Sequence, residues 1–357
     1  MTLVLSNEEV EAVLDIDACL EAMETAYRDL DEARGVNGVR SEILTPTARD
    51  DALYSLLTMQ AVIPKFGVGA VRINSDILTW PNNAGGLRRV KVPAAPNERY
   101  VGLVLLFSTA TGEPLAIYPD GVVQKMRVAA TCGLGARYMA REEAREATIL
   151  GSGWQADGQA MAIAAVRPIE RLRVFSPSRE RREAFARETA QKLGIEVVAA
   201  DSAREAVRGS DVVMCATNSM QPVFPPEWLE PGMHVSSLKT LELPPETIAR
   251  ADIVATHVRT FPTRTERAKG ADLARDTERQ KATLSSTVKQ DAMPDLVDLI
   301  CGRAPKRESP QDITVFINYA GLGYQFAATG HVIHREATAR GLGRNLDTDW
   351  FTSAVPS

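Results

Sequence analysis

The sequence predicts an α/β protein of two domains, in which a parallel-sheet domain is inserted into a discontinuous α+β domain. Its 357 residues suit two domains, because a domain typically holds about 100 to 200 residues. Between residues 147 and 258, short apolar strands alternate with helical segments, a pattern typical of a parallel sheet covered on both faces. The flanking segments lack this alternation, so we expect residues 1–122 and 315–357 to form one domain and 123–314 the other.

Helices followed by an antiparallel sheet are expected in the first part of the chain. Ser6 followed three residues later by Glu9 is a helix-start signal, and apolar residues at helical spacing continue from there, which predicts one or two helices. Residues 52–80 and 100–118 are instead β-rich runs, and the second contains a hairpin-turn signal at Thr111-Gly112-Glu113. The stretch 80–96 is rich in Pro, Asn and Gly and predicts a loop.

The later elements follow the same kind of pattern. Residues 124–139 have helical spacing and lead into the strand–helix alternation. Residues 259–311 are more charged, which predicts helix and loop that close the sheet. The last stretch, 313–341, begins as a strand and becomes a long helix. No strand–helix partner is left for it, so we expect it to return to the first domain.

The amino-acid composition and net charge indicate which class of molecule the protein binds. Hydrophobic residues make up 45% and charged residues 24% of the chain, which excludes disordered, collagen-like and coiled-coil proteins. A net charge of −5 gives no electrostatic reason to expect nucleic acid or an anionic membrane, so a small molecule is the expected partner. The N-terminus has no basic segment before an apolar stretch, and no run of about 18 apolar residues occurs. We therefore expect a cytoplasmic protein without a membrane span.

The cysteines indicate neither a metal site nor a disulfide. None of the four shows the C-x-x-C spacing or the nearby paired histidines of a zinc site, and they lie far apart in the sequence. We expect reduced thiols and no metal. The four residues are Cys19, Cys132, Cys215 and Cys301.

A glycine-rich turn after the first strand of the alternating region predicts a dinucleotide site. Residues 151–156 read G-x-G-x-x-A between a predicted strand and a predicted helix, which is the context this fingerprint requires. Gly151 permits the tight turn, and Gly153 lets the backbone approach a pyrophosphate at the helix N-terminus. We therefore expect a Rossmann-type domain with cofactor contacts from Gly151, Gly153, Trp154 and Gln155. An ordinary glycine-rich turn is the alternative, which the repeated strands and helices disfavour.

The end of the second strand indicates which dinucleotide binds. An acidic side chain there usually binds the ribose 2′-OH of NAD, whereas cationic and hydroxyl groups accept the additional phosphate of NADP. The strand is followed by Ser176, Ser178 and Arg179, and Arg182 lies one turn later. No Asp or Glu stands at the end of the strand. We therefore expect NADP (NADPH) in preference to NAD, with Ser176, Ser178 and Arg179 at the 2′-phosphate. The alternative is a basic, solvated helix start.

Further cofactor contacts are expected where later strands end. Thr217 and Asn218 follow the fourth strand of the predicted sheet, and Ser237 ends the next one. Cofactors bind at the carboxyl edge of such sheets, so these residues are candidates, with Thr217 at the nicotinamide half.

Several long segments resemble one known family. The sequence is similar to the ornithine cyclodeaminase and mu-crystallin family of NAD(P)-dependent amino and imino acid enzymes over nearly the whole chain. The resemblance implies a discontinuous substrate-binding and dimerisation domain around the Rossmann domain, hence a homodimer, and a small amino, imino or keto acid as substrate. The segments that carry it are LSNEEV, TGEPLAIYPDGVVQKMRVAATCGLGARYMA, ILGSGWQA, VFSPSRERREAFA, SDVVMCATNSMQPVFPPEWLEPGMHVSS and DITVFINYAGLGYQFAA.

The resemblance also implies cationic residues that bind the substrate carboxylate. An Arg before the fingerprint maps onto Arg127, and one in an N-terminal loop onto Arg40. The family's Lys on the following strand has no clean match, and we expect Arg72 to replace it, with Lys65 as the fallback, because a guanidinium can grip a carboxylate at two points. For each Arg the alternative is a surface or interdomain ion pair. Lys239 is a candidate for handling a proton or the substrate amine, together with Glu242, unless both are solvated loop charges.

The sequence departs from the cyclising members of the family. Those carry an Asp in a Gly-Asp loop after the strand that contains His234, and here Leu241 occupies that position without Gly-Asp. The family's Phe-Lys-Ser-x-Gly segment becomes Phe316 to Gly321, which includes Asn318, an expected cofactor contact, and a later Asp becomes Gln325. Ornithine cyclisation is therefore disfavoured.

The resulting prediction is an NAD(P)H-dependent oxidoreductase that transfers hydride between the nicotinamide and the α-carbon of an imino or amino acid. Such an enzyme is of the ketimine reductase or amino acid dehydrogenase type. The alternatives are a cyclodeaminase that recycles NAD, and a non-catalytic dinucleotide-dependent binding protein like mu-crystallin.

Overall fold

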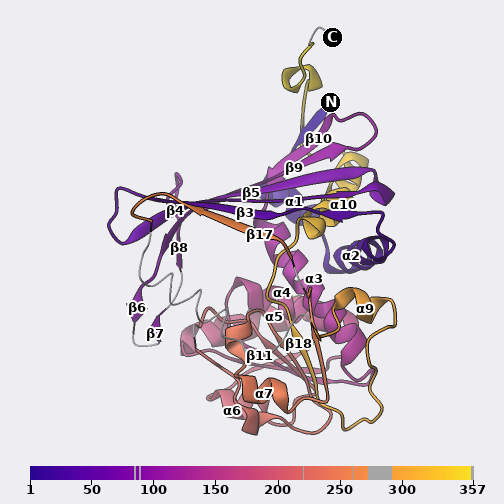
Figure 1. Ribbon diagram of the computed structural model, residues 1–357. Helices are drawn as coiled ribbons and strands as arrows, with labels where there is room; N and C mark the ends of the chain where they lie inside the picture. Colours follow the sequence, from indigo (N-terminus) through magenta and orange to yellow (C-terminus); the bar gives the residue numbers. More distant parts are fainter. Residues whose placement is uncertain (84–85, 88–89, 220, 260, 272–291, 355–357) are drawn as a thin grey trace.

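The computed structural model describes residues 1–83, 86–87, 90–219, 221–259, 261–271 and 292–354, and two large sheets organise these residues (Figure 1). The first sheet is ten-stranded in the described residues, with the order β17-β3-β4-β5-β9-β10-β1-β19, while β2 pairs with β4 and β8 with β5. Its strands are β1 (Thr2–Val4), β2 (Val36–Asn37), β3 (Arg40–Pro46), β4 (Ala52–Ile63), β5 (Val68–Thr79), β8 (Val90–Val92), β9 (Val101–Ser108), β10 (Pro114–Pro119), β17 (Thr263–Arg267) and β19 (Arg344–Leu346).

The second sheet is wholly parallel and has the order β13-β12-β11-β14-β15-β18-β16. The strand order reverses between β11 and β14, which is where such sheets bind dinucleotides. The predicted α/β fold class is therefore confirmed. The strands are β11 (Glu146–Leu150), β12 (Arg171–Phe175), β13 (Glu196–Ala199), β14 (Val212–Cys215), β15 (His234–Ser237), β16 (Ile253–Thr256) and β18 (Thr314–Ile317).

Helices cover both sheets. The predicted start at Ser6 is a capping box, because the Glu9 N–H donates to the Ser6 side chain and the Ser6 N–H to the Glu9 side chain. The structure describes no helix that is both long and apolar enough to cross a membrane. The helices are α1 (Asn7–Val13), α2 (Ile16–Asp31), α3 (Gly121–Met139), α4 (Trp154–Val166), α5 (Arg179–Leu193), α6 (Ala203–Val207), α7 (Pro245–Ala249), α9 (Leu296–Ile300) and α10 (Gly323–Arg340), with the 3₁₀ turns η1 (Pro64–Phe66), η2 (Pro226–Trp228), η3 (Thr240–Glu242) and η5 (Thr348–Phe351).

Two strands, β17 and β18, lie in a different sheet from the one expected from the predicted domain limits. β18 lies between β15 and β16 in the parallel sheet, although residues 315–357 were expected in the first domain. Its four residues are all buried, as in the central strands of parallel sheets. β17 was expected as helix or loop of the parallel-sheet domain and instead pairs with β3 in the first sheet. Its TRTER sequence is charged and mostly exposed, as edge strands often are.

The predicted loop at 80–96 contains short strands. β6 (Asn82–Asn83) and β7 (Gly86–Leu87) form a two-stranded ribbon, and β8 pairs with β5. Strands of two or three residues are too short to show an alternating pattern in the sequence. The part of the expected helix and loop at 272–291 lies outside the described residues.

Helix α3 connects the two sheets. It packs against α2 and α10 of the first domain and against α4, β15 and β18 of the second. Gly135 makes the approach to β18 close, since a Cβ atom there would lie 2.6 Å from the Phe316 ring. The Arg167 guanidinium donates to the backbone carbonyls of Ala136, Arg137 and Ala140, which satisfies the C-terminal end of α3. The helix therefore holds a set position between the sheets.

Candidate cofactor and substrate site

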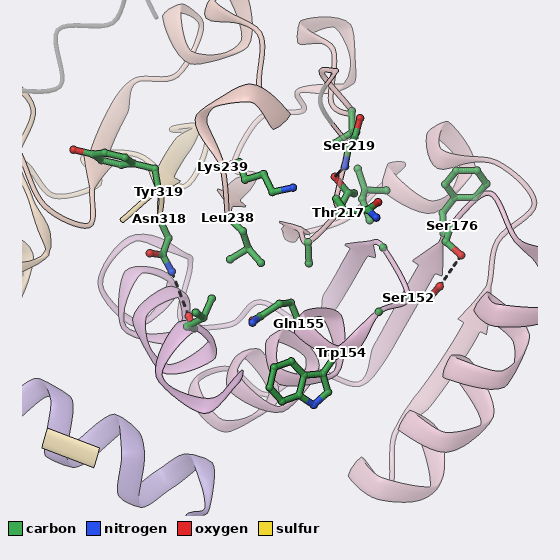
Figure 2. Close-up of a pocket in the computed structure, with 18 of the residues that line it drawn as sticks. Ser152, Trp154, Gln155, Ser176, Thr217, Ser219, Leu238, Lys239, Asn318 and Tyr319 are labelled. Atoms are coloured by element: carbon green, nitrogen blue, oxygen red, sulfur yellow. Dashed lines mark hydrogen bonds between the residues drawn. The ribbon is translucent and has the colours of Figure 1, made fainter. Parts of the chain in front are cut away.

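A cavity of about 1010 Å³ lies along the carboxyl edge of the parallel sheet. Its walls come from the turn after β11, the end of β12, the segments after β14, β15 and β18, and helix α3. Figure 2 shows Ser152 and Ser176 at one end, and Asn318 and Tyr319 at the other. A cavity of this size at a topological switch point suits an extended dinucleotide together with a small molecule.

The glycine turn has the geometry that the fingerprint requires. Gly151 has a φ of +121°, and a Cβ atom there would lie only 2.3 Å from the Ala216 carbonyl oxygen. Gly153 is the N-cap of α4, and a Cβ atom there would have no atom of the described part of the chain within 4 Å. No described side chain caps the N-terminus of α4, so its first N–H groups can bind an anion. These residues therefore fit a dinucleotide pyrophosphate.

Trp154 and Gln155 follow in the first turn of α4, and both line the cavity. The Gln155 Oε1 atom is buried and accepts no hydrogen bond from the described residues. A buried acceptor without a donor costs free energy, which a ligand N–H or O–H could recover. The Lys125 Nζ atom lies 5.9 Å from the Trp154 ring centroid.

Of the basic residues that follow β12, some line the cavity and others do not. Ser176, Ser178 and Arg181 line the cavity, whereas Arg179 does not. The Arg179 side chain is 78% exposed and pairs with Glu183 one turn along α5. Arg182 is buried and donates to the Ser176 carbonyl. Sequence reasoning missed Arg181, because the helical phase depends on the residue at which α5 begins.

The strand ends at the centre of the sheet supply the next wall. Thr217, Asn218 and Lys239 line the cavity, and Figure 2 shows Thr217 and Lys239 across it from Gln155. Ser237 lies outside the lining, fully buried, and its hydroxyl has no partner among the described residues.

Asn318 lines the far end of the cavity, where it follows β18. Its amide donates to the Val128 carbonyl and to the Cys132 sulfur, both 3.3 Å away. These contacts orient the Asn318 side chain against α3.

Arg127 is a buried cation between neutral partners. Only 6% of the residue is exposed, its Nη1 donates to Gln325 Oε1 at 2.9 Å, and its Nη2 donates to Gln124 Oε1 at 2.8 Å. The Nε–H is buried and has no acceptor among the described residues. Burial lowers the pKa of Arg127 to about 9, and the nearby charges of Arg72 and Arg40 add to the shift. Because Arg127 lines the cavity, a ligand carboxylate there would meet an uncompensated positive charge.

The other expected anion-binding residues have different surroundings. Arg72 grips a carboxylate, but that of Asp120, with its Nη2 and Nε atoms 2.7 and 2.8 Å from Oδ2. It lies outside the cavity lining, with its guanidinium 5.0 Å from the Phe326 ring centroid. Arg40 does line the cavity, from the start of β3. Lys65 is exposed on η1, away from the lining.

The structure thus brings together most of the residues expected from the sequence. No Asp, Glu, His or Cys occurs among the described residues that line the cavity, so Lys239, Tyr319 and the arginines are its titratable groups in that part of the chain. Burial raises the pKa of Tyr319, whose hydroxyl donates to the Val258 carbonyl. The expected residues in the lining are Arg40, Arg127, Gly151, Gly153, Trp154, Gln155, Ser176, Ser178, Thr217, Asn218, Lys239 and Asn318, and those outside it are Lys65, Arg72, Arg179 and Ser237.

Known proteins resemble this chain over its whole length. It is 26% identical over 353 residues to a Delta(1)-pyrroline-2-carboxylate reductase of Bacillus cereus, covering 97% of this chain and 99% of that protein. It is also 26% identical over 353 residues to an alanine dehydrogenase of Archaeoglobus fulgidus, covering 97% and 98%.

A solved structure supports the same relationship. The Delta(1)-pyrroline-2-carboxylate reductase of Thermococcus litoralis, in complex with NADH and L-proline, matches with a TM-score of 0.77 and 25% identity, covering 97% of this chain and 100% of that one. The family model for the ornithine cyclodeaminase/mu-crystallin family matches residues 89–341, which include the fingerprint, Arg127 and the strand ends around the cavity. The chain therefore belongs to the ornithine cyclodeaminase/mu-crystallin family.

Proposed function

We propose that the protein is an NAD(P)H-dependent oxidoreductase that transfers hydride between the nicotinamide and the α-carbon of an imino or amino acid. The observation that carries this proposal is the placement of Arg127. It is a buried cation held by two amides, in the same cavity as the dinucleotide turn. A carboxylate bound there stands beside a cofactor that carries hydride. The Bacillus cereus and Thermococcus litoralis relatives are reductases of a cyclic imino acid by name, which supports this substrate class.

Different residues of the cavity bind the cofactor, bind the substrate carboxylate and exchange a proton in the proposed reaction. The N-terminus of α4 holds the pyrophosphate, and Arg127 binds the substrate carboxylate, so both reactants are oriented before the reaction. A dinucleotide held there would supply the hydride for the imine carbon, and the nitrogen would retain its proton. An iminium is already cationic, so the protein needs little general acid strength. Lys239 is the candidate for exchanging a proton with the nitrogen once product forms.

Cyclodeamination is disfavoured because it needs a group that handles the distal amine. Leu241 stands where the cyclising members carry Asp, and no described residue of the cavity lining is acidic. Turnover decides between the oxidoreductase and a non-catalytic binding protein: NADPH oxidation with cyclic imino acids, or with keto acid plus amine, supports the enzyme. Tight NADPH binding without turnover supports the binder.

For the cofactor, we propose NADPH in preference to NADH. Ser176, Ser178 and Arg181 surround the end of β12, and no acidic residue there meets the ribose hydroxyl. A guanidinium and two hydroxyls match a 2′-phosphate better than a 2′-OH. We also propose a cytoplasmic location, since the four free cysteines suit a reducing compartment.

A second copy of the chain is the proposed partner. One face of the first sheet presents apolar residues in register across three strands, such as Ile117, Leu105 and Val71, and Leu103 beside Ile73. Leu103 is 39% exposed although it lies on a strand near the middle of the sheet. An exposed apolar face of this kind is typical of an interface between subunits.

The dimer is tested by replacing apolar residues on that face. Wild-type protein should sediment at twice the 38.8 kDa of one chain. The double variant Leu103→Glu/Leu105→Lys should sediment as a monomer, because charges on the face oppose its burial. A monomeric wild type, or a double variant that stays dimeric, would contradict this interface.

The glycine turn is tested by Gly153→Val. A Cβ atom at Gly153 meets no atom of the described residues within 4 Å, so the variant should fold with a melting temperature near that of the wild type. The branched side chain would occupy the space where the pyrophosphate approaches the backbone, so NADPH binding should be lost. Titration of NADPH fluorescence and a thermal melt give both readouts. Wild-type affinity in this variant would refute the assignment of the turn.

Two neighbouring arginines test cofactor choice. Arg181→Ala should weaken NADPH about tenfold to a hundredfold, or roughly 1.5 to 3 kcal/mol, with little change for NADH, because only NADPH carries the 2′-phosphate. Arg179→Ala is the matched control on the same helix, since that side chain points away from the cavity. A selective loss in Arg179→Ala instead would favour the choice made from the sequence. Equal losses for both cofactors would contradict a phosphate contact.

The carboxylate anchor is tested with a pair of substrates. Arg127→Ala should lower kcat/KM for a cyclic imino acid, and the change should correspond to a loss of roughly 2 to 5 kcal/mol in transition-state stabilisation. The affinity for NADPH should stay near the wild-type value. Arg127→Lys should recover only part, because an ammonium lacks the planar two-point grip. The control is the same cyclic imine without its carboxylate, over which the wild type should strongly prefer the acid. If Arg127→Ala keeps that preference, the anchor lies elsewhere, with Arg40 as the next choice.

A further inference from the structure

Glu242 is a buried carboxylate behind the cavity wall. It ends η3, is 0% exposed, and does not line the cavity. Its Oε1 accepts from both the backbone N–H and the hydroxyl of Thr217, each at 2.7 Å. Its Oε2 accepts from the Leu238 N–H at 2.9 Å. The two carboxylate oxygens therefore join the segment after β14 to the segment after β15.

The hydrogen bonds around Glu242 suit an ionised carboxylate. The backbone N–H groups of Thr217 and Leu238 can only donate, so each carboxylate oxygen accepts at least one hydrogen bond. Burial raises the pKa of Glu242, while the hydrogen bonds from Thr217 and the charge of Lys239 act in the opposite direction. The backbone of Glu242 adds a further tie, because its carbonyl accepts from the Val223 N–H at 2.9 Å.

The two joined segments form the wall at one half of the cavity. Thr217, Leu238 and Lys239 all line it. The end of β12 lies on the other side of the topological switch point and receives the adenosine ribose in this fold, so the β14 and β15 ends face the nicotinamide half. In addition, the Thr217 hydroxyl accepts from the Ser219 N–H at 3.2 Å, which extends the order imposed by Glu242 along the loop.

We propose that Glu242 is a positioning residue that shapes the nicotinamide half of the cofactor site by holding the loops after β14 and β15 together. It acts through Thr217 and Leu238 and touches neither cofactor nor substrate. This inference rests on the proposed dinucleotide function. It assigns the role of a carboxylate that sequence reasoning could place only as a possible proton-handling group or a solvated charge.

Binding measurements with two ligands test the role. Full NADPH carries the nicotinamide, whereas 2′-phospho-ADP-ribose contains only the adenosine half and the pyrophosphate. Glu242→Gln keeps the size of the side chain but turns an amide N–H toward one of the three donors. We expect the Kd of NADPH to rise about tenfold, a loss comparable to one charge-assisted hydrogen bond, while the Kd of the fragment changes less than about twofold. Equal weakening of both ligands, or of neither, would overturn the proposal.

Further variants sharpen the experiment. Glu246→Gln on α7 is the matched control, because Glu246 is exposed and lies only four residues away, and both ligands should bind it as they bind wild type. Thr217→Val removes one donor to Glu242, and because Thr217 also lines the cavity, its loss of NADPH affinity is interpreted only together with the double variant. If Glu242→Gln does not fold, Glu242→Asp, which keeps the charge on a shorter side chain, should give the nicotinamide-selective loss instead. In the double variant the two losses should be less than additive, because they break one contact. Full additivity would overturn the proposed route through Thr217.

The design separates this inference from the function on which it rests. If wild-type protein binds neither NADPH nor the fragment, the dinucleotide function itself fails, and the role of Glu242 fails with it. If wild type binds both and Glu242→Gln binds both equally well, only the role of Glu242 is overturned.

Discussion

The placement of α3 between the two sheets is the constraint on which the site depends. The helix carries Arg127 in its second turn and leads through a short link into β11, whose end is the dinucleotide turn. Its C-terminal carbonyls are bound by the Arg167 guanidinium, and Gly135 lets it lie directly against Phe316 of β18. A buried helix held at these points cannot shift without leaving polar groups unpaired or opening the core. Arg127 and the glycine turn therefore keep one relative position.

The two buried arginines Arg72 and Arg127 differ in the charge of the groups that they contact. The charge of Arg72 is paired with the carboxylate of Asp120, although it still helps to lower the pKa of Arg127. Among the described residues, the side chain of Arg127 donates only to the amide oxygens of Gln124 and Gln325, which accept hydrogen bonds without cancelling its charge. An isolated buried charge is costly, and an arriving carboxylate removes that cost. Gln325 is a neutral partner, so its hydrogen bond leaves the charge of Arg127 available to a ligand.

Acidic groups contribute to this site from behind its wall. The described lining contains cations, hydroxyls and amides, which suits an anionic cofactor and an anionic substrate. Glu242 is fully buried at the same edge of the sheet, where its two carboxyl oxygens accept hydrogen bonds from Thr217 and Leu238. Such an arrangement orders the cavity wall without placing a carboxylate against the ligands. In the proposed role, Glu242 orders the site without contacting the substrate, because it does not line the cavity.

Local patterns in the sequence determined the elements and the cofactor turn. Strand–helix alternation, the capping box at Ser6 and the fingerprint around Gly151 depend on residues close together in the chain, so they could be predicted without a structure. The sheet to which a short strand belongs depends on distant partners, and for this reason β17 and β18 differed from the expected domain limits. Likewise, Arg181 faces the cavity and Arg179 does not because the two residues lie at different angles around α5. Arg72 is paired with the carboxylate of Asp120, whereas Arg127 donates to the neutral amide of Gln325, and both partners are distant in the sequence. Which cation faces the cavity, and that Glu242 is buried, were decided by tertiary packing, because burial and charge pairing join residues far apart in the sequence.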